Sequence, residues 1–425
     1  MNGTGEVLEW AVMMIQFDPK LQFDRLVEKK LLNKKHIELL ADSIITFHNS
    51  LPSSDPESRY GNATDTHKPV LDNYLQAKHF DAKKLFTDRL NKLQHWHEAQ
   101  FSRCENLINN RKNHGLVREC HGDLHLGNIA LQHDEIIIFD CIEFNDNLRH
   151  IDLINEISFL LMDLDAKDQT NLANHFMNYW LQKCGDFEAL YLLNYFRVYR
   201  AMVRTKVSII EASQQTGKNK NSALEQAELY ISLAQRYTSA SNNAIIINHG
   251  LSGSGKSTIS KQLASPINAI YIRSDIERKR LLPSNSNIYS KDATKKTYDR
   301  LEEACKAILT SGYSAIIDAT FLAYERRKQF FSLAKTLNTP CIILDFYAPQ
   351  KLLEKWLVER AERGTDASDA DINILRQQIK TQDTLTAQEQ NISIFLDTSQ
   401  TIDIKSLVRK IRHMLEIVKT SKNLF

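Results

Sequence analysis

The pattern of hydrophobic and polar residues divides the chain into two parts with different periods. From about Leu31 to Thr238, hydrophobic residues recur mostly at helical spacing, with one short strand pair in "IALQHDEIIIFD". From Ala244 onward, short apolar stretches ("AIIIN", "AIYI", "SAIID", "CIILDFY") alternate with amphipathic helical segments. Such alternation predicts a parallel β-sheet covered by helices on both faces. We therefore expect a mainly α part followed by an α/β part.

Two polar stretches interrupt the first part. Leu51 to Lys68 is rich in Pro, Ser, Asp and Asn, and it predicts a loop. The unpatterned "QQTGKNKNS" leads into a capping box, Ser222 with Glu225 three residues on, which predicts that a helix begins there. The side chains expected on the buried face of that helix are Ala223, Ala227, Tyr230, Ile231 and Ala234.

The length of the chain limits the number of domains, and its net charge limits the classes of partner. A chain of 425 residues is too long for one ordinary core, so two or three domains are expected. The polar "TSASNN" marks the boundary, which gives one domain at residues 1–240 and a second at 241–425. Lys and Arg (54) nearly balance Asp and Glu (52), so the net charge of +2 indicates no polyanion-binding surface. The expected partner is a small molecule, rather than a nucleic acid or a membrane.

The cysteines and the first residues indicate a compartment. Six cysteines are scattered without a CxxC pair, which predicts reduced thiols and neither a disulfide framework nor a zinc site. The start "MNGTGEVLEW" lacks a basic stretch followed by an apolar one, and no apolar run reaches 18 residues. We therefore expect a cytoplasmic protein.

The stretch "GLSGSGKS" fits the phosphate-binding pattern G-x-x-x-x-G-K-[ST]. It follows an apolar strand and opens the helix "KSTISKQLA", where backbone N–H groups and the helix N-terminus can hold phosphate oxygens. Lys256 would bridge the β- and γ-phosphates, and Ser257 would bind Mg²⁺. The alternative is a glycine-rich turn that binds nothing. The residues expected to hold ATP are Gly250, Ser252, Gly253, Ser254, Gly255, Lys256, Ser257, Thr258 and Arg360.

Two carboxylates follow predicted strands in the second part. Asp275, in "YIRSDIER", can accept the proton of an acceptor hydroxyl, and Arg278 can bind an anionic group of that acceptor. Asp318, in "SAIIDAT", is placed to hold Mg²⁺. For each carboxylate the alternative is a helix cap.

The stretch "LVERAERGTDASDAD" predicts a lid. Arg360 and Arg363 share one helix face, and Gly364 is expected to end that helix. Such arginines can neutralise a transferring phosphate and exclude water. The alternative is a solvated face that pairs with neighbouring glutamates. Ser368 is expected to cap the next helix, with Asp371 at its third position.

On these motifs, roughly Ala244 to Arg412 resembles the small P-loop kinases grouped around gluconate kinase, chloramphenicol phosphotransferase and 5′-polynucleotide kinase. The arrangement of Asp275 and Arg278 resembles the base-and-clamp pair of the polynucleotide kinases. These families transfer the γ-phosphate of Mg-ATP to a hydroxyl. The resemblance implies Asp275 as base, with Lys256 and Arg363 as phosphate stabilisers. The acceptor varies across the group and does not carry over.

The stretch "HGDLHLGN", followed by "IIIFDCIEF", resembles the aminoglycoside phosphotransferase branch of the protein-kinase-like fold. The resemblance implies that Asp123 orients an acceptor hydroxyl and that Asn128 and Asp140 bind Mg²⁺. It also implies that Asp152 supports this loop. The two histidines, His121 and His125, are expected to form structural hydrogen bonds. The whole chain resembles proteins that join such a domain to an ATP-binding one, although "aminoglycoside" is here an analogy of fold.

The expected nucleotide cover of the first domain is short. Kinase-like enzymes hold ATP under a small β-lobe with a glycine-rich loop and a strand lysine. Before "FDRLVEKK" only 22 residues occur; Val7 to Phe17 resembles the last strand of that lobe, and neither Lys20 nor Lys29 has a strand context. The small lobe is therefore expected to be largely absent, and the first domain to be degenerate or substrate-binding.

Three functions follow from these expectations. The favoured one is a Mg-ATP-dependent phosphotransferase that acts on a hydroxyl of a small molecule through Lys256, Asp275 and Asp318. The alternative is a non-catalytic ATP-binding switch joined to a pseudokinase that binds a partner. A kinase for nucleic-acid 5′ ends is the third, and the near-neutral charge disfavours it.

Overall fold

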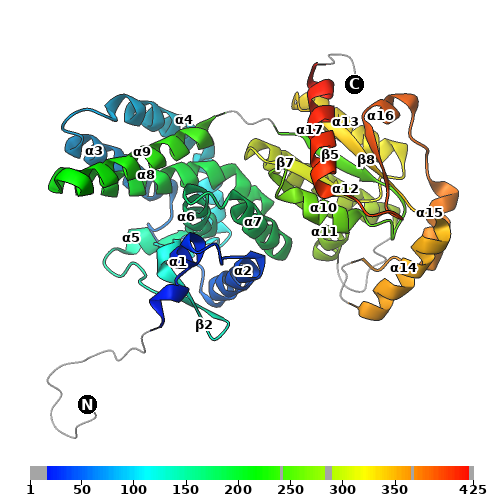
Figure 1. Ribbon diagram of the computed structural model, residues 1–425, viewed down its shortest axis with the longest axis horizontal. Helices are drawn as coiled ribbons and strands as arrows, with labels where there is room; N and C mark the ends of the chain where they lie inside the picture. Colours follow the sequence, from blue (N-terminus) through cyan, green and yellow to red (C-terminus); the bar gives the residue numbers. More distant parts are fainter. Residues whose placement is uncertain (1–16, 240–242, 283–289, 365–367, 421–425) are drawn as a thin grey trace, which may run out of the picture.

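The computed structural model describes residues 17–239, 243–282, 290–364 and 368–420. Its amino-terminal part is helical and its carboxyl-terminal part is a sheet flanked by helices, as the two periods predict (Figure 1). The predicted boundary at residue 240 lies outside the described residues. The last helix before it ends at Thr238, and the first strand after it begins at Ile245.

The amino-terminal part is built around one buried helix, α6 (Leu153–Ala166), in which 13 of 14 residues are buried. A helix that is buried on every side must be covered by others, and α8 (Leu190–Gln214) and α9 (Gly217–Thr238) pack beside it. The remaining helices are α1 (Phe23–Glu28), α2 (Lys34–Ser50), α3 (Ala63–Phe80), α4 (Thr87–Asn113), α5 (Asp146–Arg149) and α7 (Thr170–Cys184), with 3-10 turns η1 (Pro19–Leu21), η2 (Leu126–Asn128) and η3 (Phe187–Ala189).

One predicted helix start and one predicted loop differ from the structure. Helix α9 begins at Gly217, so the expected capping box at Ser222 lies inside the helix, although the five side chains predicted for its buried face are all buried. Helix α3 begins at Ala63, inside the predicted loop. There the side chain of Asn62 accepts a hydrogen bond from the backbone N–H of Asp65, which stabilises a first turn that buries Ala63.

Two small antiparallel sheets shape the loops of this part. Strands β2 (Ile129–Gln132) and β3 (Glu135–Ile138) form the predicted pair. Strands β1 (Val117–Glu119) and β4 (His150–Asp152) form a second pair that the sequence pattern did not predict, because each has only three residues. Together the sheets bring residues 120–128 and 139–149 next to each other.

The carboxyl-terminal part holds a five-stranded sheet with strand order β6-β7-β5-β8-β9, in which every neighbouring pair is parallel. Four of its strands match the predicted apolar stretches. The fifth was not predicted because only two of its five side chains are buried. The strands are β5 (Ile245–His249), β6 (Ala269–Arg273), β7 (Ser314–Asp318), β8 (Cys341–Tyr347) and β9 (Ser393–Asp397).

Helices cover both faces of this sheet (Figure 1). The side chains of three successive isoleucines on the central strand β5 point alternately to the two faces of the sheet. Ile245 and Ile247 join the core that continues into the amino-terminal part, and Ile246 joins the core on the opposite face. The helices are α10 (Lys256–Ala264), α11 (Ser274–Leu281), α12 (Lys291–Thr310), α13 (Tyr324–Thr336), α14 (Gln350–Arg363), α15 (Ile372–Thr381), α16 (Ala387–Asn391) and α17 (Ile404–Thr420).

The two parts share a buried contact. Helix α7 lies against the edge strand β6, and α8 lies against α12. Arg197 on α8 is buried between the rings of Tyr237 and Tyr313, at 5.2 and 5.6 Å from their centroids. Burial of an arginine between aromatic rings from both parts indicates a fixed arrangement. Among the described helices, none is long and apolar enough to cross a membrane.

Candidate active site

The phosphate-binding loop, residues 250–256, leaves the carboxyl end of β5 and runs into α10, as predicted. Gly250, Gly253 and Gly255 have positive φ angles of 144°, 83° and 79°. A Cβ on Gly250 would lie 2.6 Å from the carbonyl oxygen of Phe346, so the turn requires glycine there. The loop and the first turn of α10 line a cavity of about 720 Å³. This arrangement fits a bound phosphate group.

Ser257, in the first turn of α10, and Asp318, at the end of β7, meet at this cavity. The Ser257 hydroxyl donates to Asp318 Oδ2 at 2.6 Å, and Asn248 Nδ2 donates to Asp318 Oδ1 at 3.2 Å. A hydroxyl and a carboxylate in contact are the ligands that hold Mg²⁺ in P-loop proteins, so the pair fits that ion. The helix-cap alternative for Asp318 does not apply, because α13 begins only at Tyr324 after Ala323.

Lys256 is buried beside that pair. Its Nζ donates to the carbonyl oxygens of Gly250 at 3.0 Å and Leu251 at 2.6 Å. Burial lowers the pKa of Lys256 to about 8, although the carboxylates of Asp318 and Asp275 oppose the change. Burial likewise raises the pKa of Asp318, against the hydrogen bond from Ser257 and the charge of Lys256. The charges of Lys256, Asp275 and Asp318 are therefore close enough to change the pKa values of Lys256 and Asp318.

Asp275 and Arg278 lie on α11, which directly follows β6, and both line the same cavity. Arg278 Nη1 donates to Asp275 Oδ1 at 2.7 Å, and the Asp275 side chain is 25% exposed. Asp275 is not a helix cap, because Arg273 occupies that position. The structure thus brings the predicted base together with Lys256, Ser257 and Asp318, and it leaves the carboxylate accessible from the cavity.

The predicted lid arginines end α14 at the cavity wall. Gly364, with φ 62°, ends this helix as predicted. Arg360 Nη2 donates to the carbonyl oxygen of Ala370 at 2.5 Å. Arg363 also lines the cavity, but 71% of its side chain is exposed and Nη2 lies 3.7 Å from Glu359 Oε2. Both interpretations of Arg363 therefore find support: it lies at the cavity and it pairs with a neighbouring glutamate.

The expected cap at Ser368 was wrong. Asp371 precedes the first residue of α15 and accepts a hydrogen bond from Ile374 N at 2.8 Å, because a carboxylate at that position satisfies the open N–H groups of the first turn. Ser368 instead lines the cavity.

Several cavity residues had no motif to reveal them. Arg326 on α13 lies over the ring of Tyr298 on α12, 5.0 Å from its centroid, and both face the cavity that holds Asp275. In sequence, Arg326 belongs to "YERRKQF", which is typical of a solvated helix. Gln378 holds the phosphate loop through Ser252, with Ser252 N donating to Gln378 Oε1 at 2.9 Å. Only the packing of α12, α13 and α15 around the loop assigns these residues to the site.

The second motif, "HGDLHLGN", forms a loop between β1 and β2. Asn128 Nδ2 donates to the backbone oxygen of Asp123 at 3.0 Å and to its Oδ2 at 3.2 Å. Burial would raise the pKa of Asp123, but the hydrogen bond and charge of His125, together with Arg200, lower it on balance. The loop therefore holds Asp123 beside Asn128, and the lowered pKa favours the ionised form of Asp123.

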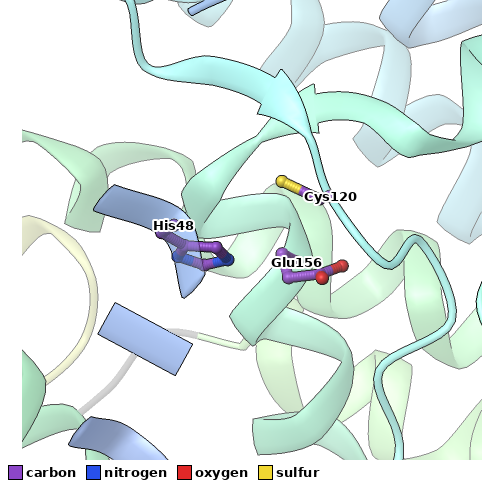
Figure 2. A group of neighbouring side chains, drawn as sticks. All are labelled: His48, Cys120 and Glu156. Carbon is purple, nitrogen blue, oxygen red and sulfur yellow. The ribbon is translucent and has the colours of Figure 1, made fainter. Parts of the chain in front are cut away.

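Glu156 on α6 fixes the start of this loop. Its two carboxylate oxygens accept hydrogen bonds from His121 N at 2.8 Å and Gly122 N at 3.0 Å. Figure 2 shows Glu156 with His48 and Cys120, three buried side chains from separate elements whose donor atoms lie within 4.8 Å of one another. Since Glu156 is engaged by the loop amides, we interpret this cluster as the support of the loop. Sequence reasoning missed Glu156, because only the packing of α6 brings it there.

Asp140 and Asp152 have different surroundings. Asp140 is exposed, has φ 62°, and follows Phe139, whose N–H donates to the backbone oxygen of Asn128 at 3.1 Å. Asp152 is buried and receives two hydrogen bonds from Arg111, at 2.7 and 2.9 Å. The carboxylate expected to support the loop therefore holds α4 to the start of α6, while Glu156 contacts the loop directly.

Two family models match the chain. Residues 2–193 match the phosphotransferase enzyme family, and residues 245–385 match an AAA domain. The chain is also similar to an uncharacterized protein from Mycobacterium tuberculosis, with 24% identity over 375 residues that span 86% of this chain and 74% of the relative. The chain therefore joins a phosphotransferase-family domain to a P-loop domain, and its parts support a role in phosphoryl transfer.

Solved structures include kinases among the similar chains. A gluconokinase from Sinorhizobium meliloti is 16% identical and matches 43% of this chain and 97% of its own, with a TM-score of 0.32. Kti12 from Chaetomium thermophilum, in complex with ADP-AlF3, is 19% identical and matches 40% of this chain and 98% of its own, with a TM-score of 0.34.

Proposed function

We propose that this chain is a Mg-ATP-dependent phosphotransferase whose P-loop domain transfers the terminal phosphoryl group of ATP to a hydroxyl of a small molecule. The observation that carries the proposal is the meeting of Lys256, the Ser257–Asp318 pair and Asp275 at one cavity of about 720 Å³. A cavity of this size accommodates a nucleotide together with part of a small acceptor.

The proposed step needs a base, a charge stabiliser and a metal site. The acceptor oxygen attacks the terminal phosphorus, a P–O bond forms, and the bond from that phosphorus to the bridging oxygen breaks. Asp275 takes the hydroxyl proton, and the products are a phosphate ester and a nucleoside diphosphate. Lys256 and Arg363 stabilise the negative charge on the transferring group, and Arg360 binds the nucleotide. Ser257 and Asp318 would hold Mg²⁺, which would supply positive charge to the phosphate oxygens.

The acceptor side of the cavity favours an anionic small molecule. Arg278 and Arg326 line it near Asp275, and Tyr298 supplies an aromatic wall. Guanidinium groups bind carboxylates and phosphates in two-point contacts. We therefore propose a hydroxyl compound that also carries a carboxylate or phosphate group, which Arg278 and Arg326 would orient.

The test is transfer of label from γ-labelled ATP to cell-extract metabolites fractionated by anion exchange. Wild-type protein should label one fraction, and Asp275→Asn should reduce the rate at least about 100-fold while the nucleotide dissociation constant stays unchanged. Asp292→Asn, an exposed aspartate on α12 outside the cavity lining, is the matched control. A switch that only binds ATP requires Lys256 and Asp318 but not Asp275. Equal labelling by wild type and Asp275→Asn would therefore reject the base assignment.

The amino-terminal loop is proposed to bind a ligand rather than to transfer phosphate. Asp123 is ionised, half-buried and held by Asn128, so it can accept a hydrogen bond from a hydroxyl. Calorimetric titration of the anion-exchange fractions into Asp275→Asn protein, compared with the Asp123→Asn/Asp275→Asn double variant, would detect such binding. Identical heats from the two proteins would reject it.

A further inference from the structure

One asparagine of the amino-terminal part forms hydrogen bonds with the backbone of β6, the edge strand of the P-loop sheet. Asn178 on α7 donates from Nδ2 to the backbone oxygen of Ala269 at 2.9 Å and accepts at Oδ1 from Tyr271 N at 2.7 Å. Its side chain is buried, and it also contacts Asn174, whose Nδ2 lies 3.3 Å from the same oxygen. A carboxamide presents one donor side and one acceptor, which match the alternating groups of a strand edge.

The strand that Asn178 contacts, β6, also carries a side chain that reaches Asp318 on β7, the carboxylate proposed to hold Mg²⁺. Tyr271, whose N–H bonds to Asn178, donates from its hydroxyl to Asp318 Oδ2 at 3.1 Å. The same oxygen accepts from Ser257 at 2.6 Å. Tyr271 and Asp318 are both buried, so neither hydrogen bond can be exchanged easily for one with water. A continuous series of hydrogen bonds thus joins α7 to the Ser257–Asp318 pair.

The same edge also carries the proposed base. Strand β6 ends at Arg273, and α11, with Asp275 in its first turn, begins at the next residue. Two further bonds attach this region to the end of α7. Arg280 on α11 donates to the backbone oxygen of Gln182 at 2.8 Å, and Arg300 on α12 donates to that of Gly185 at 2.7 Å. The amino-terminal part therefore contacts the supports of both Asp275 and Asp318.

We infer that Asn178 and Tyr271 are positioning residues for phosphoryl transfer, and that the amino-terminal domain is thereby a structural component of the P-loop active site. The inference rests on the proposed function of that site. Small displacements of a base or a metal ligand have large effects on the rate, because transfer depends mostly on positioning. A ligand that moves α7 would accordingly change the rate at the P-loop site.

The test compares three full-length variants. Asn178→Leu removes both bonds to β6, and Tyr271→Phe removes only the bond to Asp318. Asn194→Leu is the matched control, since Asn194 on α8 also bonds across the two parts, to Ser311 O at 3.1 Å, but touches neither β6 nor the cavity. We expect the first two variants to lower kcat about 10-fold to 100-fold and to raise the Mg²⁺ concentration for half-maximal rate, with KM for ATP changed less than about threefold. Asn194→Leu should stay within about twofold of wild type.

The double variant Asn178→Leu/Tyr271→Phe measures whether the two residues act through one route. Its loss in kcat should be smaller than the product of the single losses, because the second change removes a bond that the first has already displaced. The inference would be overturned if the loss in kcat of the double variant equalled the product of the two single losses. It would also be overturned if Asn178→Leu lowered kcat no more than Asn194→Leu does. If Asn178→Leu does not fold by circular dichroism, Tyr271→Phe decides, because it removes one oxygen atom.

Failure of the proposed function would be recognised separately. If wild-type protein labels no acceptor, the same variants are titrated with ADP in the presence and absence of Mg²⁺. The inference then predicts that Asn178→Leu and Tyr271→Phe weaken only the Mg²⁺-dependent part of ADP affinity. Unchanged Mg²⁺ dependence in both variants would overturn it, whatever the activity of the chain.

Discussion

The chain carries two phosphate-chemistry motifs, and their surroundings differ in a way that the motifs do not show. Around the P-loop, Lys256, Asp275 and Asp318 lie on the wall of one cavity together with four arginines. Around the second motif, Asp123 is bonded by Asn128 and His125, and the loop is fixed from behind by Glu156. The first site has its charged groups arranged around a space, whereas the second has most of its polar groups satisfied by one another. Each motif was sufficient to identify a fold, but only the cavity beside the P-loop indicates where a reaction could take place.

The largest expected effect is at the P-loop lysine. Lys256→Ala should lower kcat/KM for ATP about 1,000-fold, because the buried ammonium is the group placed to stabilise phosphate charge. The measurement is initial rate against ATP concentration. Lys261→Ala, an exposed lysine on the same helix, is the control and should match wild type. If Lys261→Ala lowered kcat/KM as much as Lys256→Ala, the P-loop lysine would have no special role, and the P-loop motif would no longer differ from the second motif in this respect.

The second effect is on stability and belongs to the other motif. Glu156→Ala should lower the free energy of unfolding by about 3 kcal/mol, because the N–H groups of His121 and Gly122 lose their acceptor in a buried place. Urea unfolding followed by circular dichroism measures the loss. Glu211→Ala, on the exposed face of α8, serves for comparison. A change below about 0.5 kcal/mol would show that water replaces the carboxylate.

The third effect is a pH dependence of nucleotide binding. The pKa of Lys256 in the free protein is about 8, and bound phosphates favour its protonated form. Affinity should therefore be constant below pH 7 and weaken through pH 8, by about tenfold at pH 9, where roughly a tenth of the lysine stays protonated. Calorimetric titration with Mg-ADP measures this. The variant Lys256→Arg stays protonated, and a similar decline in that variant would assign the dependence to another group.

The smallest effect is expected at Asp123. Asp123→Asn should leave transfer to the labelled acceptor within about twofold of wild type, because Asp123 is absent from the lining of the P-loop cavity. Label transfer under the conditions used for Asp275→Asn measures this. A loss as large as that of Asp275→Asn would mean that both motifs serve one reaction, and the comparison above would be wrong.

Apolar strands and the glycine-rich loop were predictable because both depend on local chemistry. Strands β7 and β8 coincide with "SAIID" and "CIILDFY", since runs of β-branched residues between polar stretches leave few alternatives. The P-loop, Asp275 and Asp318 were each expected to follow a predicted strand, and in a parallel sheet the ends of the strands meet at one edge. Those side chains do line one cavity.

The remainder depends on contacts between distant segments. Glu156 lies 35 residues from His121, and Asn178 lies 93 residues from Tyr271. No spacing rule connects such positions, so neither the support of the second loop nor the contact with β6 could be predicted. The early start of α9 was missed for a different reason: residues 217–221 have weak helix preference, and packing of the rest of the helix against α8 outweighs it.

The way α7 covers β6 has a practical consequence for cutting the protein. A fragment starting near residue 244 would leave the backbone oxygen of Ala269 and the amide of Tyr271 without the carboxamide that now occupies them. An uncovered strand of this kind recruits strands from other molecules, so the fragment is expected to self-associate. A useful truncation would retain α7 and would therefore begin before Thr170, about seventy residues ahead of the polar linker.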